Sequence, residues 1–316
     1  MNKYNIKFLL VVALICGIFS CKRDEVYERE QFKNVFALVS STDNVSAWIH
    51  DLRAPESTGF ISASLGGTNP STKDIRISLV EDPKLIDAYN LNAFDVNTSR
   101  YIRPLSKRKY TIDSYEFTIP AGEVKAFIPV KVRPGGLSPD SSYFIAVKVD
   151  SYSAYEVNPE KDYMLYRVQT RNWWSTSGGT AYNQRGTRLL QGSTGLPLQV
   201  FGSKRLYPLT ENSVRVLVGT ELNDNSNVHI FNWYSMVLTI SDKNKVTISP
   251  YKNVEITQID GDELYPNKVV LENVLRKTYK TFLLCYSYKA SDGRTYIMKE
   301  ELRLEYKEDP DNPRFF

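Results

Sequence analysis

The residue types that most often carry enzyme chemistry are scarce in this chain and poorly spaced. Its 316 residues include two histidines, His50 and His229, and three cysteines. A serine hydrolase needs a histidine base, but no Gly-x-Ser-x-Gly motif presents a nucleophile. His50 and Asp51 are neighbours, which point to opposite faces on a strand. We therefore predict no catalytic residues, no metal site and no cofactor.

Acidic residues offer one cluster, Asp260-Gly261-Asp262-Glu263. A glycosidase needs two carboxylates on either side of the bond it cleaves. The cluster does not match the Asp-x-x-Asp-x-Asp-x-Glu motif of chitinase-type enzymes, and its glycine indicates a turn. It also supplies too few oxygen ligands for a calcium site. A glycoside hydrolase is accordingly the third of our hypotheses.

Aromatic side chains give a stronger signal, because sugar-binding modules stack rings against the apolar face of a pyranose. Trp173 and Trp174 are adjacent, so in an extended chain only one of them can enter the core. The other either packs at a domain junction or contacts a ligand. Tyr182, Asn183 and Arg185 follow a glycine-containing loop and would add hydrogen bonds to such a site.

The stretch 228–240 alternates in the manner of a strand, with Val228, Ile230 and Tyr234 on one parity. The other parity carries His229, Phe231 and Trp233. If that face is solvated, it is an exposed aromatic patch of the kind that marks binding surfaces. If a second sheet covers it, these rings are core. The predicted glycan-binding residues are Trp173, Trp174, Tyr182, Asn183, Arg185, His229, Phe231 and Trp233.

The elements that must position these residues are β-strands. Hydrophobic residues make up 42% of the chain, too many for disorder, and Gly, Pro, Asn and Asp separate short stretches rich in Val, Ile, Phe, Tyr and Thr. The predicted strands span 35–40, 59–65, 74–80, 110–118, 123–132, 142–149, 163–170, 196–201, 213–219, 228–240, 245–249, 253–259, 268–275, 280–289 and 294–306. One helix is predicted at 83–90, where a proline suits the first turn.

These strands predict an all-β protein of two domains. Residues 34–170 suit an immunoglobulin-like β-sandwich, and residues 171–316 suit a second antiparallel β-sandwich or barrel-like domain. Asp292-Gly293 predicts a tight hairpin before the closing strand. In that strand Tyr296, Met298, Leu302, Leu304 and Tyr306 share one face, which we expect to be core.

The N-terminus has the charged start and short apolar core of a secretory signal, with Lys3 and Lys7 before the apolar run 8–19. Ser20-Cys21 at the end of this run resembles a bacterial lipobox, although a plain secretory signal with an incidental cysteine is the alternative. The resemblance implies a signal peptide at 1–20, lipidation of Cys21 and a tether at 21–33. With Cys16 removed and Cys21 acylated, only Cys285 remains, and no disulfide can form within the mature chain.

The residues Lys22-Arg23-Asp24-Glu25 resemble the acidic export signal of Bacteroidetes lipoproteins. That resemblance implies an outer-membrane protein that is lipid-anchored and displayed at the cell surface. The membrane is then a partner through the anchor. Nucleic acid is not expected as a partner, because 40 basic residues are nearly balanced by 36 acidic ones.

Spaced motifs in the first half carry a wider family resemblance. They are Leu85–Asn90, Leu105–Tyr110, Phe117–Gly122 and Tyr143–Val147. Together they resemble the N-terminal β-sandwich domain of Bacteroidetes surface lipoproteins, which also precedes some endo-β-N-acetylglucosaminidases. This chain departs from the family at Leu105-Ser106, where Leu-Pro is usual.

Such proteins are typically encoded beside starch-utilisation-type transporters, so the resemblance implies glycan capture for an outer-membrane uptake system. Our first hypothesis is therefore a surface lipoprotein that binds an oligo- or polysaccharide without cleaving it. A transporter complex is a further implied partner. The alternative is a structural or adhesin-like accessory subunit of an outer-membrane complex.

Overall fold

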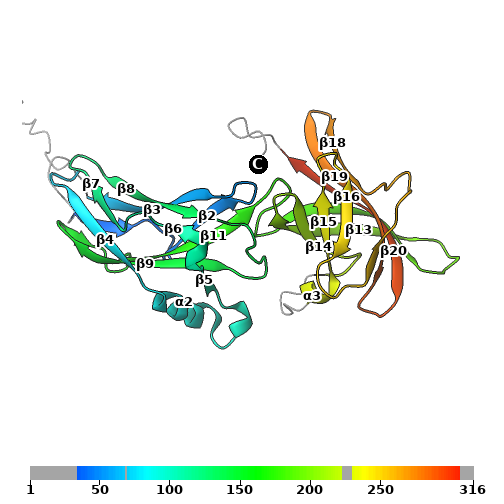
Figure 1. Cartoon of the computed structure of the whole chain (residues 1–316), viewed down its shortest axis with the longest axis horizontal. Coiled ribbons are helices and arrows are strands. Elements are labelled where there is room, and N and C mark those ends of the chain that lie inside the picture. The colour runs from blue at the N-terminus through cyan, green and yellow to red at the C-terminus, as the bar shows by residue number, and fades with distance from the viewer. Residues whose placement is uncertain (1–33, 68–69, 223–229, 307–316) are drawn as a thin grey trace, which may run out of the picture.

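The computed structural model describes residues 34–67, 70–222 and 230–306. The predicted signal peptide and tether, with Cys21, and the predicted site residue His229 lie outside these residues. The predicted all-β class is confirmed, because strands dominate both halves of the chain (Figure 1). None of the helices in the described part of the chain combines the length and hydropathy needed to cross a bilayer.

Two sheets form a sandwich in the first half. A five-stranded sheet has the order β10-β1-β3-β8-β6, and a six-stranded sheet has the order β2-β11-β9-β4-β7 with β5 beside β9. Alternation sets the faces: in β8, Ala126, Ile128 and Val130 are buried between exposed neighbours. The strands are β1 (Val35–Leu38), β2 (Val45–Asp51), β3 (Ser57–Gly66), β4 (Ile75–Glu81), β5 (Arg103–Pro104), β6 (Tyr110–Thr111), β7 (Glu116–Ile119), β8 (Lys125–Val132), β9 (Tyr143–Tyr152), β10 (Glu156–Val157) and β11 (Tyr163–Arg171).

The predicted helix is present as α2 (Lys84–Phe94) and covers part of the outer face of the six-stranded sheet. Its Ile86 packs with Phe144 of β9 and Leu165 of β11 in a small second core. The short 3₁₀ helices η2 (Thr98–Arg100) and η3 (Lys107–Lys109) follow it. The β4 and β7 end of the same face has no such cover within the described residues.

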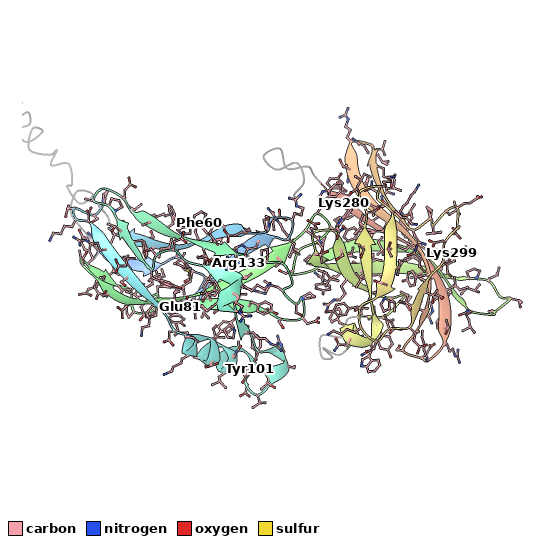
Figure 2. The ribbon with its side chains drawn as sticks, viewed as in Figure 1. Phe60, Glu81, Tyr101, Arg133, Lys280 and Lys299 are labelled. Carbon is pink, nitrogen blue, oxygen red and sulfur yellow. The ribbon has the colours of Figure 1, made fainter. Side chains whose placement is uncertain are left out.

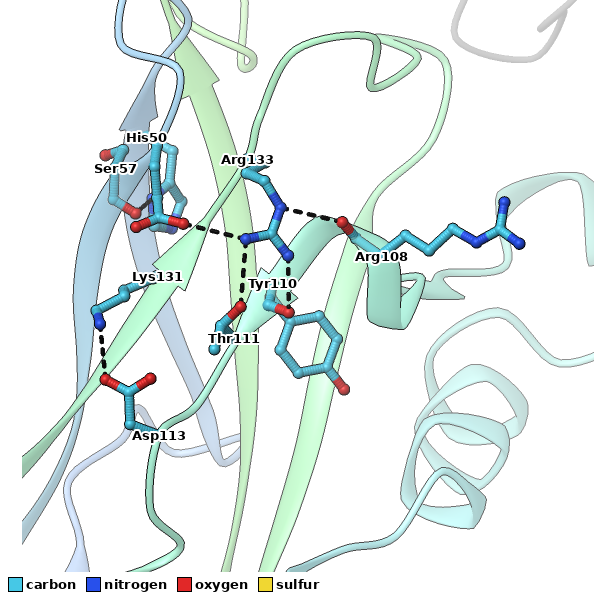
Figure 3. A network of polar contacts seen from close by, with 9 residues as sticks. His50, Ser57, Arg108, Tyr110, Thr111, Asp113, Lys131 and Arg133 are labelled. Atoms are coloured by element: carbon cyan, nitrogen blue, oxygen red, sulfur yellow. Dashed lines mark hydrogen bonds and ion pairs between the residues drawn. The ribbon is translucent and has the colours of Figure 1, made fainter.

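A single arginine ties the segment after η3 to the sandwich (Figure 3). Arg133 donates from Nε to the Arg108 carbonyl at 3.1 Å and from Nη2 to the Tyr110 carbonyl at 3.2 Å. Its Nη1 reaches Glu56 at 3.0 Å and Thr111 at 3.2 Å. The planar guanidinium thus holds two chain segments at fixed spacing.

The second half forms one curled nine-stranded sheet of barrel-like shape. Its order is β16-β15-β14-β13-β12-β20-β19-β17, with β18 also beside β19. Its strands are β12 (Thr180–Leu190), β13 (Leu198–Thr210), β14 (Ser213–Leu217), β15 (Ser235–Ile240), β16 (Val246–Pro250), β17 (Ile256–Gln258), β18 (Lys268–Val274), β19 (Lys277–Lys289) and β20 (Thr295–Tyr306). The predicted Asp292-Gly293 turn joins β19 to β20, and Gly293 has a φ of 77°.

Strand β12 had no counterpart in the sequence prediction. Its inward side chains belong to Tyr182, Gln184 and Gly186, so the alternation carries no aliphatic signal. Gly186 is required because a Cβ there would lie 2.1 Å from the Lys299 carbonyl of β20. Strand β2 was likewise missed, and the predicted strand 110–118 is two short strands, β6 and β7.

The prediction of a strand at 228–240 was wrong in its first half. Residues Ile230–Tyr234 form the short helix α3, and β15 begins at Ser235. Leu217 at the end of β14 pairs with Ser235, the first residue of β15. Residues before Ser235 therefore have no partner strand, and the backbone satisfies its hydrogen bonds as a helical turn instead.

The two halves meet at an ion pair between a buried arginine and a partly exposed aspartate. Asp140 of the sandwich accepts hydrogen bonds from Arg215 of β14 and, at 2.9 Å, from the Tyr251 hydroxyl. Burial raises the pKa of the Asp140 carboxyl, but these donors outweigh it and hold the pKa below its usual value. The Arg215 guanidinium also lies 4.3 Å from the Phe231 ring centroid and 4.9 Å from that of Tyr251.

Candidate functional site

Two of the predicted site residues are core residues and cannot contact a ligand. Trp174 is 4% exposed, and its ring lies 5.4 Å from that of Phe282. Tyr182 is fully buried and donates its hydroxyl hydrogen to the Trp174 carbonyl at 2.8 Å. The prediction failed because β12 turns Tyr182 to the inside of the sheet.

Trp173 also packs against this core, so the expectation that the paired rings diverge was wrong. The Asn172 side chain accepts hydrogen bonds from the backbone of Trp174 and Ser175, both at 2.9 Å, and bends the chain. In a bent segment neighbouring side chains need not alternate. The two rings lie 4.7 Å apart, and the ammonium of Lys280, labelled in Figure 2, is 4.6 Å from the Trp173 ring.

Helix α3 separates the remaining two predicted aromatics. Phe231 is half-buried and faces Tyr207 of β13, with ring centroids 5.6 Å apart. Trp233 is 55% exposed, as expected, but does not share a hollow with Phe231. The alternation pattern therefore predicted that Trp233 is exposed, but it wrongly placed Trp233 on a strand beside Phe231.

Phe231 borders a pocket of about 480 Å³ on the outer face of the barrel-like sheet. This size lies within the range of small-molecule sites. Four of its lining residues are apolar or aromatic, and the other four are charged or carry an aliphatic hydroxyl. We call it the β13 pocket, and its lining residues are Ser203, Lys204, Arg205, Tyr207, Leu217, Glu221, Leu222 and Phe231.

The pocket opens where β13 and β14 separate. The two strands pair only around Tyr207 and Arg215, although β13 begins at Leu198. Beyond Leu217 the chain turns at Gly219, whose φ is 49°. A Cβ at Gly219 would lie 1.8 Å from the Tyr288 hydroxyl, so only glycine allows this departure. The wedge between the diverging strands is the pocket.

A buried ion pair forms the floor. Lys204 points inward from β13 and lies 2.9 Å from the Glu300 carboxylate of β20. Glu300 is fully buried and also accepts hydrogen bonds of 2.6 Å from Gln184 and from the Tyr286 hydroxyl. Gly219 donates its backbone hydrogen to Tyr286 at 2.8 Å, which links the turn to this network.

Burial disfavours the charged form of Lys204, and its pairing with Glu300 offsets part of this cost. Burial lowers the pKa of Lys204, whereas the Glu300 carboxylate beside it opposes that change. Burial raises the pKa of Tyr286 well above its usual value. Glu300 thus remains a hydrogen-bond acceptor for three donors, and the floor is rigid.

Sequence reasoning missed the floor residues, although one signal was available. Glu300 falls on the predicted core face of β20, between Met298 and Leu302. Charged residues are rarely fully buried without a partner. A charge at a core position therefore indicates a second, opposite charge elsewhere, which here is Lys204.

Asn183 and Arg185 lie on the exposed face of β12, as a binding role requires. Asn183 is directly across from Ser203 of the pocket, and Arg185 is across from Phe201. Phe201 is 73% exposed. Arg185 forms a surface ion pair with Glu301 at 3.2 Å. The outer face thus continues from the β13 pocket across these side chains, and Phe201 is a residue that the sequence prediction omitted.

The polar lining groups can donate and accept hydrogen bonds but do not form a proton-transfer pair. Arg205 donates to the Gly179 carbonyl at 3.3 Å, and Glu221 accepts from the Ser291 backbone at 3.0 Å. In the residues that the structure describes, no three His, Cys, Asp or Glu side chains are grouped to hold a metal ion. Such a lining suits recognition of a hydroxyl-rich ligand.

Comparisons with known proteins divide the chain in two. One family model, described as an N-terminal domain, matches residues 32–156, and another, described as a C-terminal domain, matches residues 162–303. Among curated proteins no relative matches the chain. The two matches fall one in each of the two β-rich halves of the chain.

Solved structures of similar fold come from Bacteroides. A protein of unknown function from Bacteroides ovatus has a TM-score of 0.66 and 13% identity, over 89% of this chain and 99% of its own. An auxiliary nutrient binding protein from Bacteroides thetaiotaomicron has a TM-score of 0.60 and 14% identity, over 84% of this chain and 94% of its own.

The matches also include an enzyme from Bacteroides thetaiotaomicron, whose structure was determined with a Man5GlcNAc product. It has 17% identity and a TM-score of 0.32, and it covers 44% of this chain and 31% of its own. The similar structures are mostly binding proteins or proteins of unknown function. At these identities the two matches with TM-scores of 0.66 and 0.60 establish the β fold of this chain.

Proposed function

We propose that this protein binds carbohydrate without cleaving it and that the β13 pocket is its binding site. The observation that carries the proposal is the composition of the pocket. The Tyr207 and Phe231 rings stand beside Ser203, Arg205 and Glu221 in a single hollow. Rings that meet the apolar face of a sugar, with donors and acceptors for its hydroxyls, are the chemistry of such sites.

The face beside the pocket supports a ligand longer than one sugar. Phe201 presents an exposed ring, and Asn183 and Arg185 lie on the same face of the adjacent strand. The similarity to an auxiliary nutrient binding protein is consistent with a binding role. The ligand that we propose is therefore an oligo- or polysaccharide.

We further propose that the chain acts at the cell surface, anchored in the outer membrane through Cys21, and delivers glycan to an uptake system. The lipobox-like Ser20-Cys21 and the following Lys22-Arg23-Asp24-Glu25 support this location. Loss of a palmitate-analogue label in Cys21→Ala would support the anchor. Labelling that persists in this variant would contradict it.

The binding test uses native gels that contain one soluble polysaccharide each: glycogen, yeast mannan, barley β-glucan or polygalacturonate. Ser203 is exposed, so Ser203→Trp fills the pocket without disturbing the core. We expect this variant to lose at least tenfold in affinity for a polysaccharide that retards the wild type. Phe201→Ala should weaken binding less, because it lies beside the pocket.

The matched control is Gln199→Trp, an exposed position on the same strand outside the pocket lining. It should bind as the wild type does. A wild type that none of the four polysaccharides retards would contradict carbohydrate binding and favour the accessory-subunit alternative. Release of reducing sugar from a bound polysaccharide would instead indicate a glycoside hydrolase.

A further inference from the structure

The hairpin between β18 and β19 ends in a turn of unusual composition. Val274 pairs with Lys277, so the loop consists of two residues, Leu275 and Arg276. Both have a positive φ, 51° and 66°, as a type I′ turn requires. Such turns favour Asn-Gly or Asp-Gly, because these residues tolerate a positive φ. Leucine and arginine there cost stability, and residues held in such conformations are concentrated at functional sites.

The opposite end of β19 shows the usual composition. There the chain turns at Asp292-Gly293 into β20, and the positive φ of 77° falls on glycine. The Asp292 carboxylate also accepts a hydrogen bond of 2.6 Å from the Tyr296 hydroxyl, which supports the turn. The Arg276 side chain has no hydrogen bond or ion pair within the described part of the chain. Local support therefore does not explain the Leu-Arg pair at the other end.

The turn projects beyond the core and carries an apolar side chain beside a cation. Val269 near the start of β18 is buried, but Leu275 at the turn is 92% exposed. Figure 1 shows β18 rising above the rest of the barrel-like domain. Arg276 is exposed, and Lys277 beside it is paired with Glu305 at 2.9 Å. The charge of Arg276 is thus available to an anionic partner.

The sandwich presents two apolar rings on the same side of the molecule. Phe60 of β3 and Phe127 of β8 lie on the outer face of the five-stranded sheet, because their chain neighbours are buried in the core. Their ring centroids are 6.2 Å apart, and Phe127 is 60% exposed. Helix α2 covers the outer face of the opposite sheet. Figure 1 shows α2 at the bottom and β18 at the top, and Figure 2 shows Phe60 at the upper side of the sandwich.

We infer that this side of the protein docks on a lipid bilayer with anionic headgroups, through the hairpin tip and the ring pair together. Leu275 and Phe127 enter the boundary between headgroups and acyl chains, as the apolar side chains of interfacial segments do. Arg276 stays at headgroup level, attracted by the negative surface. The inference rests on the proposed location at a membrane, but it depends neither on the acyl chain nor on glycan binding.

The placement of the contacts favours a bilayer over a protein partner. The tip and the ring pair belong to different domains and face the same way, so one extended surface meets both at once. The chain between Cys21 and Val35 spans at most about 50 Å, which keeps an anchored sandwich within reach of the membrane. Figure 1 shows α3, whose Phe231 borders the β13 pocket, on the side opposite β18. Docking therefore leaves the pocket facing away from the bilayer.

The test is flotation of residues 22–316 with vesicles of phosphatidylcholine and phosphatidylglycerol at low salt. This chain lacks the apolar run 8–19 and Cys21, so neither can bind lipid. The turn variant combines Leu275→Asn with Arg276→Gly. We expect the unmutated chain to float and the turn variant to lose at least about tenfold in partition, because it lacks both contacts. Its thermal midpoint should rise, because the new residues suit a type I′ turn.

Matched controls remove equally exposed side chains elsewhere. Leu196→Asn changes a leucine that is almost fully exposed in the loop between β12 and β13, where no charged residue is adjacent, and it should float as the unmutated chain does. Phe127→Ser should weaken partition about fivefold, because a partly exposed ring no longer enters the boundary. Phe201→Ser removes a ring of similar exposure beside the β13 pocket and should leave partition unchanged.

Several outcomes would overturn the inference. An unmutated chain that stays at the bottom of the gradient would do so, as would a turn variant that floats equally well. Equal flotation with phosphatidylcholine alone would contradict the role of Arg276. A dimer in gel filtration that the turn variant converts to a monomer would instead make the tip an interface between two copies.

Failure here is distinguishable from failure of the proposed function. Polysaccharide gels and the palmitate label at Cys21 are read without vesicles, and we expect the turn variant to retain wild-type polysaccharide binding. A chain that binds polysaccharide but no vesicle would therefore refute the docking surface alone. A chain that floats with vesicles but binds none of the four polysaccharides would refute glycan binding and leave the docking surface in place.

Discussion

The β13 pocket and the outer face of strands β4 and β7 in the sandwich differ in what lies beneath them. The pocket stands on a fully buried network in which Lys204, Gln184 and Tyr286 surround the Glu300 carboxylate. On the outer face of β4 and β7, by contrast, the side chains of Arg76, Glu116 and Thr118 are exposed to water. Substitutions beneath the pocket should therefore change folding stability strongly, whereas substitutions of these exposed side chains should change it little.

The largest expected effect is at Glu300. Glu300→Ala leaves the Lys204 ammonium buried without its partner, which should lower the free energy of unfolding by about 3–5 kcal/mol. Glu116→Ala on β7 removes an exposed carboxylate and should change the free energy of unfolding by less than about 0.5 kcal/mol. Urea unfolding of both variants measures the contrast.

A double variant makes this test sharper. Lys204→Met with Glu300→Leu removes both charges and fills similar volume, so much of the lost stability should return. Equal losses in the single and double variants would mean that the two charges are not coupled. The contrast in stability between the buried floor and the solvated face of β4 and β7 would then fail.

Two uncharged residues, Trp174 and Trp233, allow a similar comparison between a buried and an exposed side chain. Trp174→Ala should lower the free energy of unfolding by about 3–5 kcal/mol, because its ring is buried against Phe282. Trp233→Ala should cost under about 1 kcal/mol, since Trp233 is largely exposed. Thermal midpoints that fall equally in both variants would contradict the burial of Trp174.

The sandwich has a buried titratable group of its own, and it predicts a smaller, pH-dependent effect. His50 is fully buried between the Ser57 carbonyl at 3.2 Å and the Tyr166 hydroxyl at 3.0 Å. Figure 3 shows His50 beside Ser57. Burial lowers the pKa of His50 to about 4, against 6.5 in the unfolded chain, although the Ser57 hydrogen bond opposes this change.

Between these values the unfolded chain binds a proton that the folded chain does not. Stability from neutral His50 is thus complete above pH 6.5 and is lost as the pH falls towards 4, by about 3 kcal/mol in total. His50→Gln should lack this part of the pH dependence. Urea unfolding at pH 7 and pH 4.5 measures it, and identical pH dependence in the variant would be the contrary result.

Some features were predictable because they depend on local pattern alone. Alternation identified most strands, the proline before Lys84 marked α2, and Asp292-Gly293 marked the last hairpin. The exposure of Asn183, Arg185 and Trp233 also agreed with expectation. Strand β12 escaped detection because its inward residues are Tyr182, Gln184 and Gly186, which give no aliphatic rhythm.

The sequence by itself determined that this is an all-β protein. It did so because side-chain period and turn residues act over a few positions. Only the tertiary structure decided which rings are accessible. Trp174 and Tyr182 are buried and Phe201 is exposed, because burial depends on what distant strands cover. The Lys204–Glu300 floor joins residues 96 positions apart, and no local pattern specifies such a pair.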